Sequence, residues 1–293
     1  MSIIKHDYEK SAGLLTEIEV HKGQREMLDR YQTISIEDFV NEYTGNFHGM
    51  EFVHCCASFT GRLKILDVGA GAGRTSLYLA LQGHDVTAIE PSPDLCSVME
   101  LLSRKANVDI AIHECSVESV DFRDDFDVCI FNASFHHCED PAAAMGNCYR
   151  SLKENGRIFL MNEPVLRFYK SKSAYYKKLK NAPGKLQHWG GNEHVYRNHE
   201  YRSFLKRAGF RPLRRKVPVF YSHPKSLLDF NLHYKGIDGY EYPFSNIALR
   251  ALWYFLLNAA LKNRLVAAIA EELSLICLTF IGIKPAKGQT AAE

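Results

Sequence analysis

The stretch that decides the fold class is Leu63-Lys64-Ile65-Leu66-Asp67-Val68-Gly69-Ala70-Gly71-Ala72-Gly73-Arg74-Thr75-Ser76-Leu77. It reads as an apolar strand, then three spaced glycines, then the start of a helix. Glycines let backbone N–H groups approach a ligand closely, and a helix start adds unpaired N–H donors with a partial positive charge. The stretch therefore predicts a turn that binds a nucleotide cofactor.

A second apolar run, residues 85–89, ends in Glu90, which lies 21 residues after Gly69. An acid at the end of the second strand can accept hydrogen bonds from both hydroxyls of a ribose. A dinucleotide fingerprint requires a further glycine at position 74, where this chain has Arg74. The spacing G-x-G-x-G thus disfavours a nicotinamide-dependent oxidoreductase.

Strands and helices are expected to alternate after the glycine turn. Strands are predicted at 65–68, 86–89, 108–113, 126–131, 157–161, 217–221 and 274–283, and helices at 74–81, 93–105 and 141–152, with Gly156 as a helix stop. Helices are also predicted before residue 60, including one that opens at Ser35, and at 247–258 and 264–272. This alternation predicts an α/β fold with a mainly parallel sheet.

Asp67 within the strand, the glycine turn and Glu90 resemble the first motifs of class I S-adenosylmethionine-dependent methyltransferases. The resemblance covers residues 63–164 well, and 194–220 and 273–285 more loosely, with Asn198 as the N-cap of the last helix. It implies a Rossmann-like, seven-stranded, mostly parallel sheet with an antiparallel strand seven and helices on both faces. N-terminal helices and a helical cap insertion are expected in addition.

This resemblance suggests a division of the chain into parts. Residues 1–60 form an N-terminal helical segment, and residues 61–223 with 273–285 form the methyltransferase core. Within the core, 165–195 is a basic insertion. Residues 224–272 are read as a helical cap over the acceptor pocket, because ligands of open α/β sheets bind at the carboxyl ends of the strands. Core extension and a dimer contact are the alternatives.

The resemblance also implies S-adenosyl-L-methionine as cofactor. Glu90 is expected to hold the ribose, Asp67 to order the loop or contact the cofactor ammonium through water, and Pro91 or Ser92 to line the adenine. An aspartate that the family often has after strand three is replaced here by Ser116. The implied cofactor-binding residues are Asp67, Gly69, Ala70, Gly71, Gly73, Glu90, Pro91, Ser116, Val117, Asn132 and Ala133.

Catalytic candidates follow strands four and five. His136 and His137 come after strand four, and a histidine is suited to accept a proton near neutral pH. Glu163 follows strand five and is a candidate base or acceptor contact. The alternative role for each is structural, as a turn cap or a loop-fixing hydrogen bond. His188, Trp189 and His194, in the basic insertion, are weaker candidates for orienting the acceptor.

Charge is distributed unevenly along the chain. The net charge is only +2, but residues 164–228 hold 16 basic side chains and only two acidic ones, Glu193 and Glu200. This favours a small acceptor carrying phosphate or carboxylate. An RNA methyltransferase, with the basic segments on phosphates, is a less favoured alternative, and a non-catalytic cofactor-binding or partner subunit is a third. The sequence predicts neither the acceptor nor the oligomeric state.

The remaining composition indicates an ordinary globular protein. The eight cysteines form no C-x-x-C pair and no metal-ligand spacing, so reduced thiols and no metal site are expected. The apolar run 251–261 is far shorter than the roughly 20 residues that span a bilayer. Membrane association through a helix at 249–261 would fit a lipid-linked acceptor, and packing of this apolar run inside the cap is the alternative. We find no signal-peptide pattern at the N-terminus, and a cytoplasmic location is the resulting expectation.

Overall fold

The computed structural model describes residues 30–44, 47–180, 193–213, 252, 255, 259, 263–273 and 279–288. Seven strands form one sheet in the order β3-β2-β1-β4-β5-β7-β6. They are β1 Lys64–Val68, β2 Asp85–Ile89, β3 Ile110–His113, β4 Phe126–Asn132, β5 Leu152–Met161, β6 Arg211–Leu213 and β7 Phe280–Ile283. β7 runs antiparallel to both of its neighbours, β5 and β6, and the other strand pairings are parallel, which confirms the predicted fold class.

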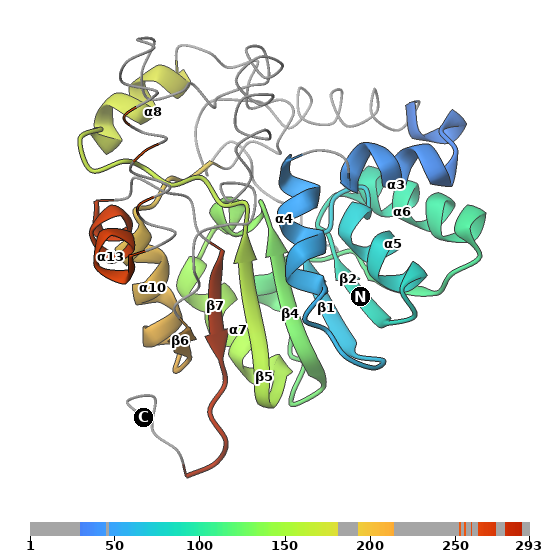
Figure 1. Ribbon diagram of the computed structural model, residues 1–293. Helices are drawn as coiled ribbons and strands as arrows, with labels where there is room; N and C mark the ends of the chain where they lie inside the picture. The colour runs from blue at the N-terminus through green and yellow to red at the C-terminus, as the bar shows by residue number, and fades with distance from the viewer. Residues whose placement is uncertain are drawn as a thin grey trace.

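Helices cover both faces of this sheet (Figure 1). The α-helices are α3 Ile36–Thr44, α4 Phe47–Cys56, α5 Arg74–Leu81, α6 Pro93–Ala106, α7 Pro141–Ser151, α8 Lys172–Lys180, α10 Asn198–Arg207 and α13 Arg264–Glu272. Two short 3₁₀ turns, η1 Val117–Ser119 and η2 Phe135–His137, follow β3 and β4. In Figure 1, α8 lies beyond the carboxyl ends of β4 and β5.

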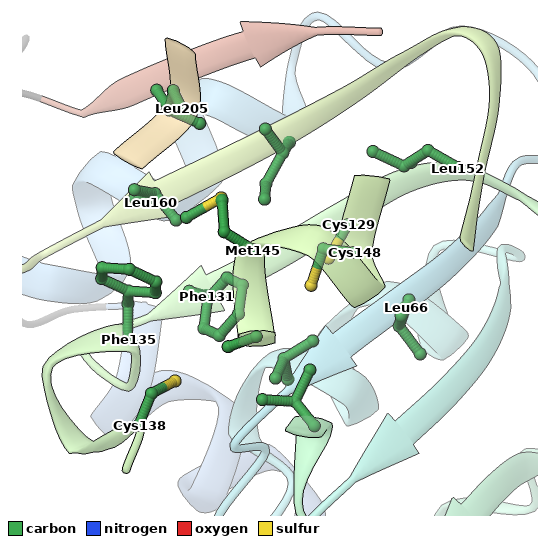
Figure 2. Packing of buried hydrophobic residues seen from close by; sticks show 14 of the residues in the cluster. Leu66, Cys129, Phe131, Phe135, Cys138, Met145, Cys148, Leu152, Leu160 and Leu205 are labelled. Carbon is green, nitrogen blue, oxygen red and sulfur yellow. The ribbon is translucent and has the colours of Figure 1, made fainter. Parts of the chain in front are cut away.

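The two faces of the sheet have separate apolar cores because successive strand residues point to opposite sides. On β4, Val128 and Ile130 join one cluster, whereas Cys129 and Phe131 join the other. The first cluster packs against α4 and α5, and the second against α7 and α10. Figure 2 shows residues of the second cluster, which include Leu66, Leu160, Met145, Cys148 and Leu205.

The N-terminal helices pack onto the same face as α5 and α6. Ser35 caps α3 as predicted, its Oγ accepting a hydrogen bond from the backbone N–H of Asp38 at 3.0 Å. Tyr31 and Phe39 are almost fully buried beside Leu77 of α5. Residues 1–29 of the predicted N-terminal segment lie outside the described residues. The described part of the N-terminal segment, from residue 30 onward, therefore packs against α5 and α6, the helices that follow the glycine turn.

Two predictions, one about strand β6 and one about the start of strand β5, are wrong. The sixth strand is Arg211–Leu213, before the predicted 217–221, which lies outside the described residues. A three-residue edge strand containing Pro212 lacks the apolar pattern by which strands are recognised. Gly156 does not stop α7, because Leu152 already has extended geometry and Gly156 lies within β5. A Cβ on Gly156 would lie 2.8 Å from the carbonyl oxygen of Lys153, so packing requires glycine here.

The predicted cap of α10 is wrong by one residue. Arg197 is the N-cap, with extended backbone, and Glu200 accepts a hydrogen bond from its N–H at 2.8 Å. Asn198 is instead the first helical residue.

The predicted insertions are only partly described. The 264–272 helix is present as α13, which packs against α10, and Arg202 pairs with Glu272. The helix predicted at 247–258, most of the 224–272 cap, residues 274–278 of the predicted strand seven, and both His188 and Trp189 lie outside the described residues. The division into domains therefore stays a prediction. Among the described residues, we find no helix with the length and apolar character needed to cross a bilayer.

Candidate active site

The glycine turn joins β1 to α5 with three residues in the left-handed region. Gly69, Gly71 and Gly73 have φ of 66°, 57° and 84°. A Cβ on Gly69 would lie 2.6 Å from Cβ of Ser134, and one on Gly73 would lie 2.5 Å from Cγ of Met99. A Cβ on Gly71 would meet no atom within 4 Å. Gly69 and Gly73 are thus required by packing, whereas Gly71 faces open space.

Glu90 bridges the glycine turn and the start of α6. Its Oε2 accepts a hydrogen bond from the N–H of Gly71 at 2.8 Å, and its Oε1 accepts one from the N–H of Ser92 at 3.0 Å. Burial raises the pKa of Glu90 to about 7, while these two N–H donors favour the ionised form. Each carboxylate oxygen retains a second lone pair. The carboxylate can therefore accept hydrogen bonds from two hydroxyls beside the open face at Gly71.

Asp67 lies under the turn, in β1. It is 1% exposed, and Ser76 of α5 donates a hydrogen bond from Oγ to its Oδ2 at 2.6 Å. Burial raises the pKa of Asp67 to about 7, and the Ser76 hydrogen bond opposes this shift. The contact ties strand β1 to the helix that follows the turn. This geometry supports the loop-ordering role among those considered for Asp67.

A polar cluster that the sequence did not predict surrounds Asn132 at the end of β4. Its Nδ2 donates to the hydroxyls of Tyr43 and Thr75, the latter at 3.0 Å, and its Oδ1 accepts from Nδ2 of Asn162 at 2.6 Å. Tyr43 comes from α3, so the N-terminal segment reaches the end of the central strands. No sequence pattern connected Tyr43 with the site. Asn162, which directly precedes the predicted Glu163, was not among the predicted residues either.

The other expected cofactor residues lie near strand ends on the same side. Ala133 follows β4 with φ of 57°, and its N–H donates to the carbonyl of Met161 at 2.8 Å. Ser116 and Val117 form the start of η1, after β3. Pro91 precedes Ser92, whose Oγ caps α6 by accepting from the N–H of Leu95 at 3.4 Å. No ligand contact tests these residues, and their assignment stays a prediction.

Glu163 holds the turn that carries His136. Its carboxylate accepts hydrogen bonds from the N–H groups of Ser134, Phe135 and His136 at 3.0, 2.9 and 3.1 Å. It also lies 2.8 Å from Nδ1 of His136. Burial raises the pKa of Glu163 to about 7, and the three backbone donors oppose this by favouring the carboxylate. The loop-fixing alternative for Glu163 thus has direct geometric support.

His136 is consequently held in one orientation. Burial lowers its pKa to about 4, so the imidazole is neutral near pH 7, and Glu193 opposes this shift. With Nδ1 directed at the Glu163 carboxylate, Nε2 carries the lone pair. Nε2 lies 3.7 Å from Oε2 of Glu193, and Nδ1 of His137 lies 3.7 Å from the same oxygen. The two imidazole rings are 3.9 Å apart between centroids.

Glu193, noted in the sequence only for its charge, also belongs to this cluster. Tyr175 of α8 donates a hydrogen bond to its Oε1 at 3.1 Å. The neighbouring His194 donates from its backbone N–H to the carbonyl of His136 at 3.0 Å. The end of the basic insertion therefore lies against η2. Being one of only two acids within 164–228 was the available signal for Glu193.

Ser134 connects the glycine turn to this histidine cluster. Its Oγ donates to the carbonyl of Val68, just before Gly69, at 2.5 Å, and its N–H donates to Glu163. The two halves of the candidate site are therefore built against each other at the carboxyl ends of β1, β4 and β5. An arrangement of this kind can hold a nucleotide-type ligand on one side and a reacting group on the other.

Residues 66–160 match the family model of the methyltransferase domain. Together with the strand order and the glycine turn, this match supports a methyltransferase domain of the class I S-adenosylmethionine-dependent type over residues 66–160. The enzymes of this family use S-adenosyl-L-methionine as the methyl donor.

Curated relatives include ubiquinone biosynthesis O-methyltransferases. That of Pseudomonas putida strain GB-1 is 31% identical over 105 residues, which are 35% of this chain and 45% of the relative. That of Methylococcus capsulatus is 32% identical over 112 residues, covering 38% and 47%. The chain thus spans less than half the length of these relatives.

Solved structures share the fold at low identity. A putative sarcosine dimethylglycine methyltransferase from Galdieria sulphuraria has a TM-score of 0.55 and 18% identity, covering 90% of this chain and 98% of that one. The [4+2]-cyclase SpnF has a TM-score of 0.54 and 15% identity, covering 92% and 96%. These likenesses concern the fold, which supports more than one chemistry.

Proposed function

We propose that the chain transfers a methyl group from S-adenosyl-L-methionine to a hydroxyl of a small, anionic acceptor. The observation that carries this proposal is the link through Ser134 between the glycine turn and the Glu163–His136 pair. This link supports the proposal because the glycine turn and His136, the candidate base, lie at adjacent strand ends. The O-methyltransferase relatives support a hydroxyl acceptor over an amine.

The residues of the turn fit this cofactor. Gly71 offers a face that a side chain would cover, and Glu90 has lone pairs left for ribose hydroxyls. Asn132 and Ala133 lie at the end of β4, where the methionine portion is expected, and Ser116 and Val117 at the end of β3, where the adenine is expected. When bound, S-adenosyl-L-methionine supplies an electrophilic methyl group on a sulfonium.

The acceptor hydroxyl would lose its proton to His136. Nε2 is the ring nitrogen left available by the Nδ1 contact to Glu163, and the imidazole is neutral near pH 7. Glu163 acts as a positioning residue, since it fixes both the turn and the ring. His137 and Glu193 border the same space. Enclosure of the hydroxyl by this cluster and by α8 would exclude water and hold the oxygen in line.

A small acceptor is favoured over RNA because described basic residues of the 164–228 region are used within the protein. Arg197 donates to the carbonyls of Arg167 and Lys170 at 2.8 and 2.9 Å, and Lys172 pairs with Glu200 at 2.6 Å. Such contacts hold the insertion against α10 rather than present its charges to a phosphate backbone. A phosphate or carboxylate on the acceptor, the cap role of 224–272 and a cytoplasmic location are further parts of the proposal.

The test is an acceptor screen with S-adenosylhomocysteine release as readout. We expect turnover with one or more hydroxylated acids or phosphorylated metabolites, and loss of at least a hundredfold in kcat for His136→Gln. His113→Gln, which changes a histidine at the end of β3, serves as the control and should retain full activity. Turnover only with RNA, or equal turnover by His136→Gln, would contradict the proposal.

A further inference from the structure

Three potential ligand atoms converge on one point next to the strand ends. The described His, Cys, Asp and Glu side chains contain one group able to hold a metal ion, formed by His136, His137 and Glu193, with ligand atoms all within 4.8 Å of one another. Oε2 of Glu193 lies 3.7 Å from Nε2 of His136 and 3.7 Å from Nδ1 of His137. These separations exceed hydrogen-bond length, so the carboxylate faces both rings without bonding to either.

Two of the three separations are close to the edge length of a tetrahedral coordination polyhedron. Ligand atoms about 2.1 Å from a tetrahedral metal ion stand about 3.4 Å apart. The two separations from Glu193, at 3.7 Å, would need to close by about 0.3 Å to reach this edge, and the third, between the two ring nitrogens, is within 4.8 Å. Octahedral neighbours, at about 3.0 Å, would require larger movements.

We propose that His136 Nε2, His137 Nδ1 and Glu193 Oε2 bind one divalent transition-metal ion of the Zn²⁺ type. Two imidazoles and one carboxylate are a ligand set suited to such ions rather than to Mg²⁺ or Ca²⁺, which prefer all-oxygen shells. Three protein ligands leave a coordination position for a water molecule or for a hydroxyl of an acceptor.

Outer-shell contacts orient two of the three ligands. Nδ1 of His136 lies 2.8 Å from the Glu163 carboxylate, which directs Nε2 toward the cluster. Tyr175 donates to Oε1 of Glu193 at 3.1 Å, which leaves Oε2 directed at the rings. A carboxylate behind a ligating histidine is a regular feature of metal sites. These two contacts are observations separate from the distances among the three ligand atoms. They therefore give additional support for a metal site.

The cysteine spacing gave no reason to expect a metal, and the three ligands come from two segments 56 residues apart in the chain. The site does not depend on the proposed methyl transfer, because binding needs no cofactor. The metal ion and the proton of the acceptor would compete for the same lone pair on Nε2 of His136, so the base role proposed above belongs to the metal-free protein.

The test is a titration of chelator-treated full-length protein with Zn²⁺ by calorimetry, and with Co²⁺ by visible absorption. We expect one site, whose affinity falls at least a hundredfold in His137→Asn and in Glu193→Gln. Glu163→Gln should lower it 10- to 100-fold, as expected for an outer-shell residue. His113→Asn is the matched control and should bind as the wild type does. Circular dichroism verifies that each variant is folded.

Absence of stoichiometric binding, or binding that persists unchanged in both ligand variants, would overturn the proposal. His137 and Glu193 are partly exposed, at 22% and 13% of their side-chain surfaces, so their variants are expected to fold. If the protein binds no metal ion, the proposed role of His136 as a base is unaffected. Failure of the methyltransferase proposal would instead appear as absent S-adenosylmethionine binding or turnover in protein that still binds the metal.

Discussion

Glu163 contacts His136 twice, accepting from its backbone N–H at 3.1 Å and lying 2.8 Å from its Nδ1. Since Glu163 follows β5 and His136 follows β4, one carboxylate fixes the relative position of two strand ends. It also determines which ring nitrogen of His136 faces the cluster. A single buried acid therefore serves both stability and the orientation of the candidate base.

Replacement of Glu163 by glutamine should destabilise the fold. A glutamine keeps one acceptor oxygen but turns an amide NH₂ toward backbone N–H donors, so at least one donor loses its partner. We expect a loss of about 2–4 kcal/mol in the free energy of unfolding, measured by urea denaturation. Glu100→Gln on the exposed face of α6 is the control, with an expected change below about 0.5 kcal/mol. Equal stabilities of the two variants would show that the Glu163 contacts are dispensable.

Substitution of Gly71 should weaken cofactor binding more than it weakens the fold. Gly71→Ala places a methyl group into open space at φ of 57°, so we expect a folded protein that has lost about 1 kcal/mol of stability. Its affinity for S-adenosylmethionine should fall at least tenfold, because the methyl group covers the face offered to the cofactor. Gly61→Ala, with φ of 72° and equally open surroundings, should show the same strain and unchanged affinity. Unchanged affinity in Gly71→Ala as well would place the cofactor elsewhere.

Cofactor binding should depend on pH through Glu90. Its pKa is about 7 and ribose hydroxyls donate to the ionised form, so binding is weak below pH 7, strengthens as pH rises, and levels off above pH 8. Between pH 6 and pH 8 the ionised fraction, and with it the affinity, increases about tenfold. The probe is 5′-methylthioadenosine, which carries the ribose but no titrating amino group. Glu90→Gln should bind the probe weakly at every pH. Asp67→Asn should keep the same pH dependence of affinity. Loss of this pH dependence in Asp67→Asn would assign the titration to Asp67 instead.

The Tyr43 hydroxyl should couple the N-terminal helices to the site. Tyr43→Phe removes a buried partner of Asn132 and Thr75, for which we expect a loss of about 1–2 kcal/mol in unfolding free energy. Tyr78→Phe in α5 is the control, since that side chain is only partly buried. Thermal unfolding of both variants distinguishes the two positions. A change no larger in Tyr43→Phe than in Tyr78→Phe would mean that the polar cluster contributes little.

The sequence predicted the parallel half of the sheet well because local patterns determine it. Apolar runs followed by glycine or helix caps specify β1, β2 and β4, and the turn from Gly69 to Gly73 is a short-range motif. The edge strand Arg211–Leu213 was missed, since three residues that include Pro212 carry no strand pattern and depend on pairing with β7.

The candidate site was predicted only where its residues follow a motif. Gly71, Glu90 and His136 lie next to strand ends that the sequence reveals. Tyr43 and Glu193 reach the site through long-range packing of α3 and of the segment before α10, which no local pattern encodes. The role of Glu163 could be stated only as an alternative, because a carboxylate after β5 is compatible with either catalysis or loop fixing until its partners are known.

Isothermal titration calorimetry with S-adenosylmethionine tests the central claim most directly, with Glu90→Ala as the comparison and circular dichroism as the check on folding. The cofactor site built from the glycine turn and Glu90 predicts saturable binding near one equivalent, weakened at least tenfold in Glu90→Ala. Absence of binding by folded protein, or equal affinity in folded Glu90→Ala, would contradict it.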